Sequence, residues 1–360
     1  MKISDERIGE RIVSILDELI ATPTPTGQEE ELLPYLSNAL NERRFDVHEQ
    51  RISIGRRNLI GKRAEGSLLL RAHMDTFPAY THPLPYRLRR FGDDLIGRGV
   101  VDCKGLIAAL LVAVELSDAP CQIAFVSDEE RGGLGSKELE LDESIKAALV
   151  LEPTDAHLII AHAGSLEFEV TMFGRAAHGA MPQEGENAIE NAWALIERLK
   201  QLPFVHRTHP LFQNVPLFTL GVMHGGYEPM VVPNRCTFQV DMRVLPGDDL
   251  DEALAQVRHL VVQAGGELTI LDVTPPVVFN GDERIIKIVA HAHEAIWGAQ
   301  AQCIGYHSWT DAVNLIQRGI PAIVYGAGHL GDAHSDQEKV KLSDLVKVCK
   351  VYQLVLESWN

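Results

Sequence analysis

Hydrophobic residues recur along the chain at two spacings, and each spacing predicts a different kind of element. Helical spacing, with apolar residues three to four positions apart, predicts helices at 8–20, 29–40 and 105–116. Short continuous apolar runs are typical of strands buried on both faces, and they occur at 67–72, 122–126 and 147–151. Because strands and helices alternate here, the pattern predicts an α/β layer with a mostly parallel sheet.

The pattern changes near residue 164, where apolar and polar residues begin to alternate as in half-solvated strands. Such strands are predicted at 166–173, 217–222, 236–244 and 267–273, with helices at 187–199 and 250–264. The α/β pattern then returns, with a helix at 283–297, a strand at 322–325 and a last helix at 343–359. We therefore predict a discontinuous first domain at 1–163 and 276–360, whose mostly parallel mixed sheet is flanked by helices. The domain inserted at 164–275 is predicted to be α+β, with two helices and a four-stranded antiparallel sheet.

Composition narrows the class of protein. A length of 360 residues favours two domains, and a net charge of -17 disfavours nucleic acid and anionic membranes as partners. The longest apolar stretch, 106–114, is too short to span a bilayer, and the N-terminus has no signal-peptide core. The five cysteines are scattered without a CxxC pair, which fits a reducing compartment. We expect a soluble, cytoplasmic protein.

Histidine and acidic residues fall at the ends of the predicted strands or just after them. His73 ends one strand, Glu129 and Glu130 follow the next, and Glu152 follows the third. Two more, Asp102 and His334, precede the apolar helix and follow the 322–325 strand. Open α/β sheets build their sites at the carboxyl ends of strands, so we expect these side chains to meet. Mixed nitrogen and oxygen ligands suit Zn, Mn or Co, and the spare carboxylates suit acid/base work, which indicates a two-metal hydrolase.

Each of these residues also has a plainer interpretation. Asp102 is placed to cap the helix that follows it, and a Glu129–Glu130 pair is most often a solvated charge run. His73 and Asp75, two residues apart, are explained equally well as loop residues. On an extended segment they instead point the same way, so that the Asp75 carboxylate could accept the second ring N–H of His73.

The motifs together resemble the co-catalytic metallopeptidase and deacylase family that contains acetylornithine deacetylase, succinyl-diaminopimelate desuccinylase, aminoacylase, carboxypeptidase G and peptidase T. The resemblance covers essentially the whole chain. Its most specific pieces are Ala-His-Met-Asp-Thr at 72–76, Gly-Arg-Gly at 97–99 with Asp-Cys-Lys-Gly at 102–105, Ser-Asp-Glu-Glu at 127–130, Leu-Glu-Pro-Thr at 151–154 and Ala-His-Ser at 333–335. Gly-Arg-Ala-Ala-His at 174–178 is similar to the signature of the family's inserted domain.

The resemblance implies a centre with two divalent metal ions, Zn above all, with Co or Mn as alternatives. Asp102 would bridge the ions, and its peptide bond to Cys103 would be cis. His73 and Glu152 would complete one site, and Glu130 and His334 the other.

The remaining roles that the resemblance implies concern catalysis and substrate. Glu129 would be general base and acid, and Asp75 would orient His73. His178 of the inserted domain would stabilise the oxyanion, often across a homodimer. Arg243 would bind a substrate carboxylate, beside a pocket floor formed by Trp309 and Thr310, where Ser308 and Trp309 replace the usual Gly-Gly.

The function that the resemblance implies is removal of an acyl group from an N-acyl amino acid, as in acetylornithine deacetylase. A water held between the ions would attack the amide, with Glu129 as its base, and the inserted domain would serve as lid and dimerisation domain. The alternatives are a succinyl-diaminopimelate desuccinylase, a related lysine-releasing hydrolase, or a di- or tripeptidase acting on short peptides. A non-catalytic binding homologue should have lost ligands, whereas all five and Glu129 are present.

Overall fold

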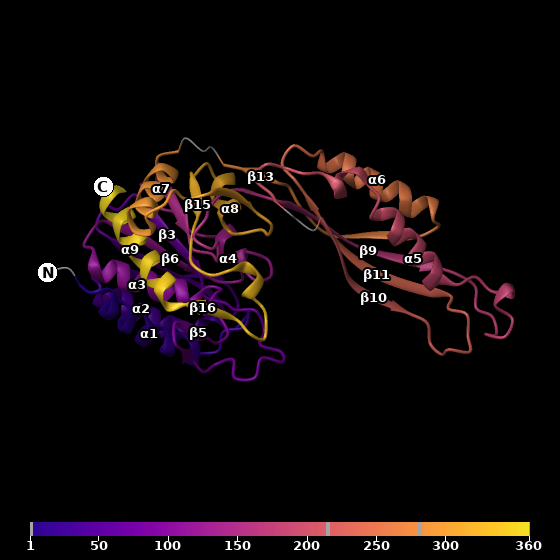
Figure 1. Cartoon of the computed structure of the whole chain (residues 1–360), viewed down its shortest axis with the longest axis horizontal. Helices are drawn as coiled ribbons and strands as arrows, with labels where there is room; N and C mark the ends of the chain where they lie inside the picture. Colours follow the sequence, from indigo (N-terminus) through magenta and orange to yellow (C-terminus); the bar gives the residue numbers. More distant parts are fainter. Residues whose placement is uncertain (1–2, 214–216, 280–282, 360) are drawn as a thin grey trace. The chain divides into compact units, whose positions relative to one another are not determined.

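The computed structural model describes residues 3–213, 217–279 and 283–359. The chain divides into two compact units (Figure 1). The first comprises Met1–Ile160, Phe279–Ile304 and Thr310–Asn360, and the second comprises Ala161–Val278 and Gly305–Trp309. The two sequence-based boundaries each lie three residues away from these, and they leave 305–309 in the first domain. That short segment belongs to the second unit, where the Gly305 N–H donates to the Leu211 carbonyl (2.7 Å).

A mixed sheet in the order β1-β2-β6-β3-β7-β15-β8-β13 forms the centre of the first unit, and β14 pairs with β8. Its middle strands β6, β3, β7 and β15 are parallel, whereas β1, β2, β8 and β13 pair in antiparallel fashion. The predicted mixed sheet is therefore confirmed. The strands are β1 Asp46–Ser53, β2 Arg56–Arg63, β3 Leu68–His73, β6 Cys121–Val126, β7 Ala147–Val150, β8 Leu158–His162, β13 Val277–Val278, β14 Cys303–Tyr306 and β15 Ala322–Val324.

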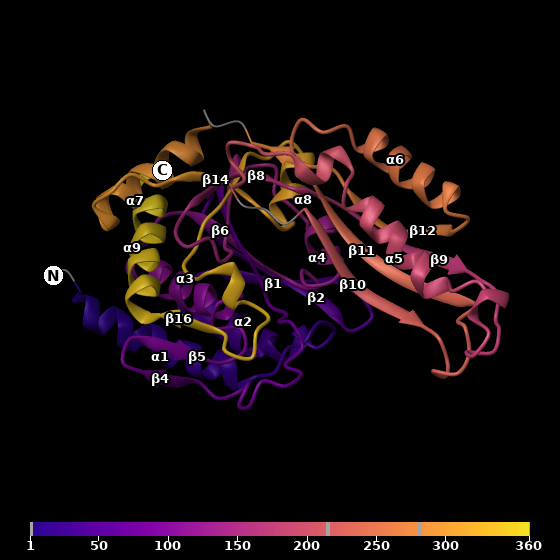
Figure 2. The same cartoon turned by 45° about the vertical axis from the view of Figure 1, so that its right-hand side comes forward.

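Four long helices pack side by side in the first unit, in the order α1, α3, α9, α7 (Figures 1 and 2). They span α1 Asp5–Ala21, α3 Lys104–Leu116, α7 Arg284–Trp297 and α9 Leu342–Trp359. Leu70 points toward this layer, whereas its neighbour Arg71 pairs with Asp311 at the start of α8. Because neighbouring strand residues face opposite sides, α8 (Ala312–Gln317) covers the other face of the sheet, next to α4 (Leu134–Lys137).

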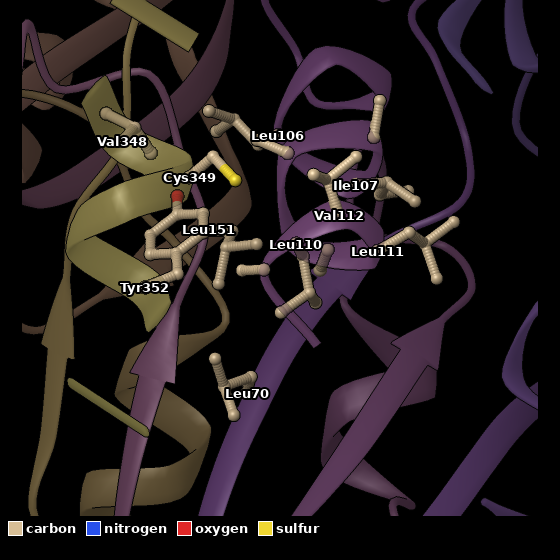
Figure 3. Packing of buried hydrophobic residues seen from close by; sticks show 14 of the residues in the cluster. Leu70, Leu106, Ile107, Leu110, Leu111, Val112, Leu151, Val348, Cys349 and Tyr352 are labelled. Atoms are coloured by element: carbon tan, nitrogen blue, oxygen red, sulfur yellow. The ribbon is translucent and has the colours of Figure 1, made fainter. Parts of the chain in front are cut away.

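The main core lies between the sheet and helices α3 and α9 (Figure 3). Helix α3 is apolar all round and its residues from Lys104 to Val114 are buried, as expected of a helix enclosed on every side. Leu106 and Leu110 contribute to this core with Leu151 of the sheet layer and Tyr352 of α9 (Figure 3). This packing fixes the start of α3, where the segment carrying Asp102 ends.

The segment predicted as one helix at 29–40 is divided. A 3-10 helix, η1 (Glu29–Leu32), precedes α2 (Leu33–Glu42). Pro34 lies in the first turn of α2, where its missing N–H costs nothing, so the α-helix begins there and not at Glu29. A separate three-stranded sheet has the order β16-β5-β4 (β4 Arg89–Phe91, β5 Asp94–Ile96, β16 Lys339–Lys341).

The second unit is the predicted α+β insert, with a four-stranded antiparallel sheet in the order β10-β11-β9-β12. Helices α5 and α6 contact each other and pack on this sheet over a separate core. The elements are β9 Gly164–Phe173, α5 Ala188–Leu199, β10 Phe218–Gly225, β11 Arg235–Val244, α6 Leu250–Gln263 and β12 Glu267–Thr274, with 3-10 turns at Pro182–Glu184 and Pro203–His206. In the parts of the chain that the structure describes, we find no helix long and apolar enough to cross a membrane.

Candidate metal centre

Three parallel strands bring the candidate ligands together. Strands β6, β3 and β7 are neighbours, so their carboxyl ends meet at one edge of the sheet. His73 is the last residue of β3, Glu130 follows β6, and Glu152 follows β7. Asp102 reaches the same edge from the segment before α3, and its peptide bond to Cys103 is cis, as the resemblance implied.

Two groups of three ligand atoms result, and Asp102 belongs to both. His73, Asp102 and Glu152 form one group, and Asp102, Glu130 and His334 form the other, each with ligand atoms within 4.8 Å of one another. Asp102 Oδ1 lies 3.0 Å from His73 Nε2, and its Oδ2 lies 3.4 Å from His334 Nε2. The two oxygens of one carboxylate thus face different groups, which is the arrangement that a bridging ligand requires.

The ring of His73 is oriented by a backbone carbonyl. Its Nδ1 lies 2.9 Å from the Asp75 carbonyl oxygen, whereas the Asp75 carboxylate is 3.5 Å away. Because a carbonyl only accepts, Nδ1 carries a proton, and Nε2 faces Asp102 and Glu152. His73 is fully buried, so the orientation is fixed on all sides.

The buried Asp75 carboxylate instead holds the turn that carries the two glutamates. Its Oδ1 accepts from the Glu129 N–H (3.2 Å), and its Oδ2 accepts from the Glu130 N–H (3.1 Å) and the Thr26 hydroxyl (3.0 Å). Sequence spacing had suggested only a contact with His73. Asp75 thus anchors the backbone of both glutamates.

This turn makes further contacts that the sequence analysis did not predict. The buried Glu29 accepts from the Asp128 N–H (3.1 Å), and Asp128, at φ 70°, accepts from the Leu134 N–H (3.2 Å) and pairs with Arg56. The Phe77 N–H donates to Glu130 Oε1 (2.8 Å), which leaves Oε2 at 2.8 Å from His334 Nε2. The aromatic rings of Phe77 and His334 stack, with centroids 4.1 Å apart.

Burial, and after it the crowding of carboxylates, determines the electrostatics of the centre. Burial, with the charge of Asp102, raises the pKa of Glu152 to about 8, and burial with the charge of Glu152 raises the pKa of Glu129 well above its usual value. Burial disfavours a charged His334 ring, yet its hydrogen bonds to Asp102 and Glu130 raise its pKa to about 10. The centre thus stabilises positive charge.

Divalent cations fit this donor set. Glu152 Oε1 is buried and accepts no hydrogen bond from any described residue, and the nearby buried Arg71 is already paired with Asp311. Two imidazoles and three carboxylates match the preference of Zn, Co and Mn for mixed nitrogen and oxygen ligands. A cation within reach of each group would satisfy Glu152 and offset the clustered negative charge.

The other candidate residues belong to other segments of the chain, and each is described by its own contacts. His178 is exposed in the second unit, where its Nδ1 accepts from the Ala180 N–H (3.1 Å). Arg243, on β11, donates to Asp241 (2.6 Å), and Trp309 is half-buried in the same unit. Thr310, in the first unit, is buried, and its hydroxyl accepts from the Ala312 N–H (3.3 Å).

Comparison with known families gives a match over most of the chain. The model of peptidase family M20/M25/M40 matches residues 69–358. Among curated relatives, an acetylornithine deacetylase of Photorhabdus laumondii is 28% identical, with 96% of each chain covered. A probable carboxypeptidase of Aspergillus clavatus is 27% identical over 96% of this chain and 88% of the relative.

Solved structures share the fold at lower identity. A tripeptidase from Staphylococcus aureus superposes with a TM-score of 0.78 at 22% identity and covers 97% of this chain and 99% of its own. A metallo-carboxypeptidase of the M20 family from Sulfolobus solfataricus gives a TM-score of 0.79 at 16% identity, covering 96% and 98%. These likenesses establish the two-part architecture.

Proposed function

Because this chain belongs to peptidase family M20/M25/M40, we propose that it is a two-metal amide hydrolase that removes the acyl group from an N-acyl amino acid. The observation that carries the proposal is the Asp102 carboxylate, whose two oxygens face two three-ligand groups. The acetylornithine deacetylase of Photorhabdus laumondii, similar over nearly the full length of both chains, supports this substrate class.

We propose that His73, Asp102 and Glu152 hold one divalent ion, and Asp102, Glu130 and His334 the other, with Zn as the first choice and Co or Mn as alternatives. Such ions polarise an acyl carbonyl and lower the pKa of water toward about 7 when they are bound. Asp102 keeps its charge for this task, because its hydrogen bonds to His334 and His73 outweigh burial and hold the carboxyl pKa well below its usual value.

Glu129 is the residue that we propose moves the proton. It accepts the proton of the attacking water and delivers it to the nitrogen of the leaving amine. Its backbone N–H is held by Asp75, so the carboxylate keeps its position during the transfer. His178 is proposed to donate to the developing oxyanion, and Arg243 to bind the substrate carboxylate beside Trp309 and Thr310.

The inserted domain is proposed to act as lid and to form a homodimer. β10 lies at one edge of its sheet, where its unpaired backbone groups are available to a second chain, and Trp193 on α5 is 51% exposed. Light scattering of the purified protein tests this assignment: a dimer mass is expected, and a monomer with full activity would contradict it.

Peptide hydrolysis is the second candidate, because the probable carboxypeptidase of Aspergillus clavatus is about as similar as the deacetylase. The decisive assay supplies chelator-stripped protein with Zn, Co or Mn and offers N-acetylornithine, N-succinyl-diaminopimelate, and di- and tripeptides. Release of acetate from N-acetylornithine, lost on chelation and restored by the metal, is the expected result. Turnover of peptides alone would replace the deacylase by the peptidase, and no turnover of any amide would overturn both.

A further inference from the structure

A buried ion pair lies behind the metal centre, and the activity proposed above does not use it. Arg98 Nη1 donates to Glu338 Oε2 at 2.6 Å, and the two residues are only 2% and 0% exposed. They are 240 residues apart in the chain. Desolvation makes a buried ion pair costly in free energy, so the pair alone is weak evidence of a stabilising role. Its other contacts indicate what its role is.

The second oxygen of Glu338 holds the segment that carries Asp102. Glu338 Oε1 accepts from the N–H groups of Gly99 (2.9 Å), Val101 (3.0 Å) and Asp102 (3.3 Å). The segment from 97 to 103 runs between β5 and α3 and belongs to no sheet or helix. A carboxylate with three backbone donors therefore supplies the hydrogen bonds that a neighbouring strand would otherwise provide.

Arg98 extends the same pair to a second ligand. Its Nη2 donates to the backbone carbonyl of His334 (3.3 Å), while Glu338 itself lies four residues beyond His334. The pair thus touches the main chain of the shared ligand Asp102 and of one ligand in the second group.

The first group has other support. His73 ends β3 opposite Val126 of β6, and Glu152 follows Leu151, whose N–H donates to the Arg71 carbonyl (2.9 Å). His334 itself lies outside the strands: it follows a short 3-10 turn, has φ 62°, and its side chain is 42% exposed. The two groups therefore depend on Arg98 and Glu338 to different degrees.

We propose that Arg98 and Glu338 are a positioning pair for the metal centre, and that they hold the site of Asp102, Glu130 and His334 more than the site of Asp102, His73 and Glu152. The inference rests on the two-metal site proposed above. Residues that orient metal ligands in this way typically change metal affinity by about 10- to 100-fold when they are replaced. Loss of the pair should therefore weaken one ion and spare the other.

The test replaces Glu338 and counts metal ions. Chelator-stripped wild type, Glu338→Ala and Glu338→Gln are titrated with Zn²⁺ against a chromophoric competitor. We expect two ions in the wild type, and in Glu338→Ala one ion of nearly unchanged affinity and one weakened by about 10- to 100-fold. Glu338→Gln should lose less, because its amide oxygen still accepts from the three N–H groups.

The matched control is Glu115→Ala. Glu115 is likewise the carboxylate partner of a buried arginine, Arg43 (2.6 Å), and among the described residues its side chain pairs with Arg11 and Arg43 and with none of the metal centre. The Glu115→Ala protein should bind both ions with wild-type affinity. Hydrogen exchange of the metal-free proteins adds a readout that does not depend on metal. The peptide covering 98–103 should exchange faster in Glu338→Ala than in the wild type, and at the wild-type rate in Glu115→Ala.

The outcomes separate the two proposals. A wild type that binds no divalent ion overturns the metal centre and this inference together. The positioning pair alone is overturned if the wild type binds two ions and Glu338→Ala either binds both as tightly as the wild type or loses both equally. Should Glu338→Ala fail to fold, Glu338→Gln is read by the same criteria, with a weakening of about 3- to 10-fold in one ion expected.

Discussion

Replacing Asp75 by Asn separates two roles that one carboxylate could have. The resemblance assigns Asp75 to His73, which would make the substitution a loss of metal affinity. The contacts instead place the carboxylate on the Glu129 and Glu130 N–H groups, at 3.2 and 3.1 Å, and leave His73 to a backbone carbonyl at 2.9 Å. We therefore predict that Asp75→Asn lowers kcat and largely spares metal binding.

The size of the effect follows from the hydrogen bonds. Asn keeps one acceptor oxygen and presents an NH₂ group to the other N–H, so at least one of the two amides faces a donor in a fully buried place. A hydrogen bond to a charged group contributes about 1.5–3 kcal/mol, and the remaining bond also loses its charge. If the hydrogen bonds that hold Glu129 in place lose about 2–3 kcal/mol and the transition state loses the same stabilisation, kcat falls by about 30- to 150-fold.

The assay measures kcat and bound metal on the same samples, with whichever amide the wild type hydrolyses. Thr26→Val is the matched control, because it removes only the hydroxyl that donates to Asp75 Oδ2 at 3.0 Å and leaves both amide contacts. We expect less than about a 10-fold change in kcat for Thr26→Val, in line with about 1 kcal/mol for a single hydrogen bond.

Two results would refute this reasoning. The first is an Asp75→Asn protein with wild-type kcat and both metal ions. The second is a protein whose activity falls only in proportion to lost metal, since that would return Asp75 to the role of orienting His73.

Two further predictions concern the base and a buried histidine. Glu129→Gln keeps the shape of the side chain and should lower kcat by at least about 100-fold while the metal content stays unchanged, and an equal kcat would remove Glu129 from the proton transfer. Burial lowers the pKa of His162 to about 3, below its unfolded value of about 6.5, so the folded protein binds fewer protons and loses stability as pH falls from about 6.5 toward 3. At about 1.4 kcal/mol per pH unit, the free energy of unfolding measured in urea should fall by up to about 2 kcal/mol between pH 6.5 and 5. His162→Gln should reduce this fall. A variant whose unfolding free energy depends on pH as steeply as that of the wild type would exclude His162 as the source.

The buried elements were predictable because their sequences repeat a simple pattern. Strand β3 and helix α3 are enclosed on every side, so continuous apolar runs identified them. Strands β1 and β2 were missed: β1 lies at the edge of the sheet, and its residues from Asp46 to Ser53 are mostly polar and partly exposed. Three-residue strands such as β16 are too short to show any period.

The candidate ligands were predictable, whereas their supports were not. His73, Glu130 and Glu152 follow strands in a parallel sheet, so order and spacing along the chain were enough to bring them to one edge. The contacts of the Asp75 carboxylate with the Glu129 and Glu130 N–H groups were not predictable, because those residues lie 54 and 55 positions away in the chain. Glu338 gave no signal, because its partners lie about 240 residues away and no local pattern encodes them.

Anomalous scattering from crystals grown with Zn²⁺ tests the central claim most directly. We predict two peaks, one within about 2.0–2.2 Å of His73, Asp102 and Glu152 and the other within the same distance of Asp102, Glu130 and His334. A single peak that Asp102 does not share, or zinc bound away from both groups of ligands, would contradict it.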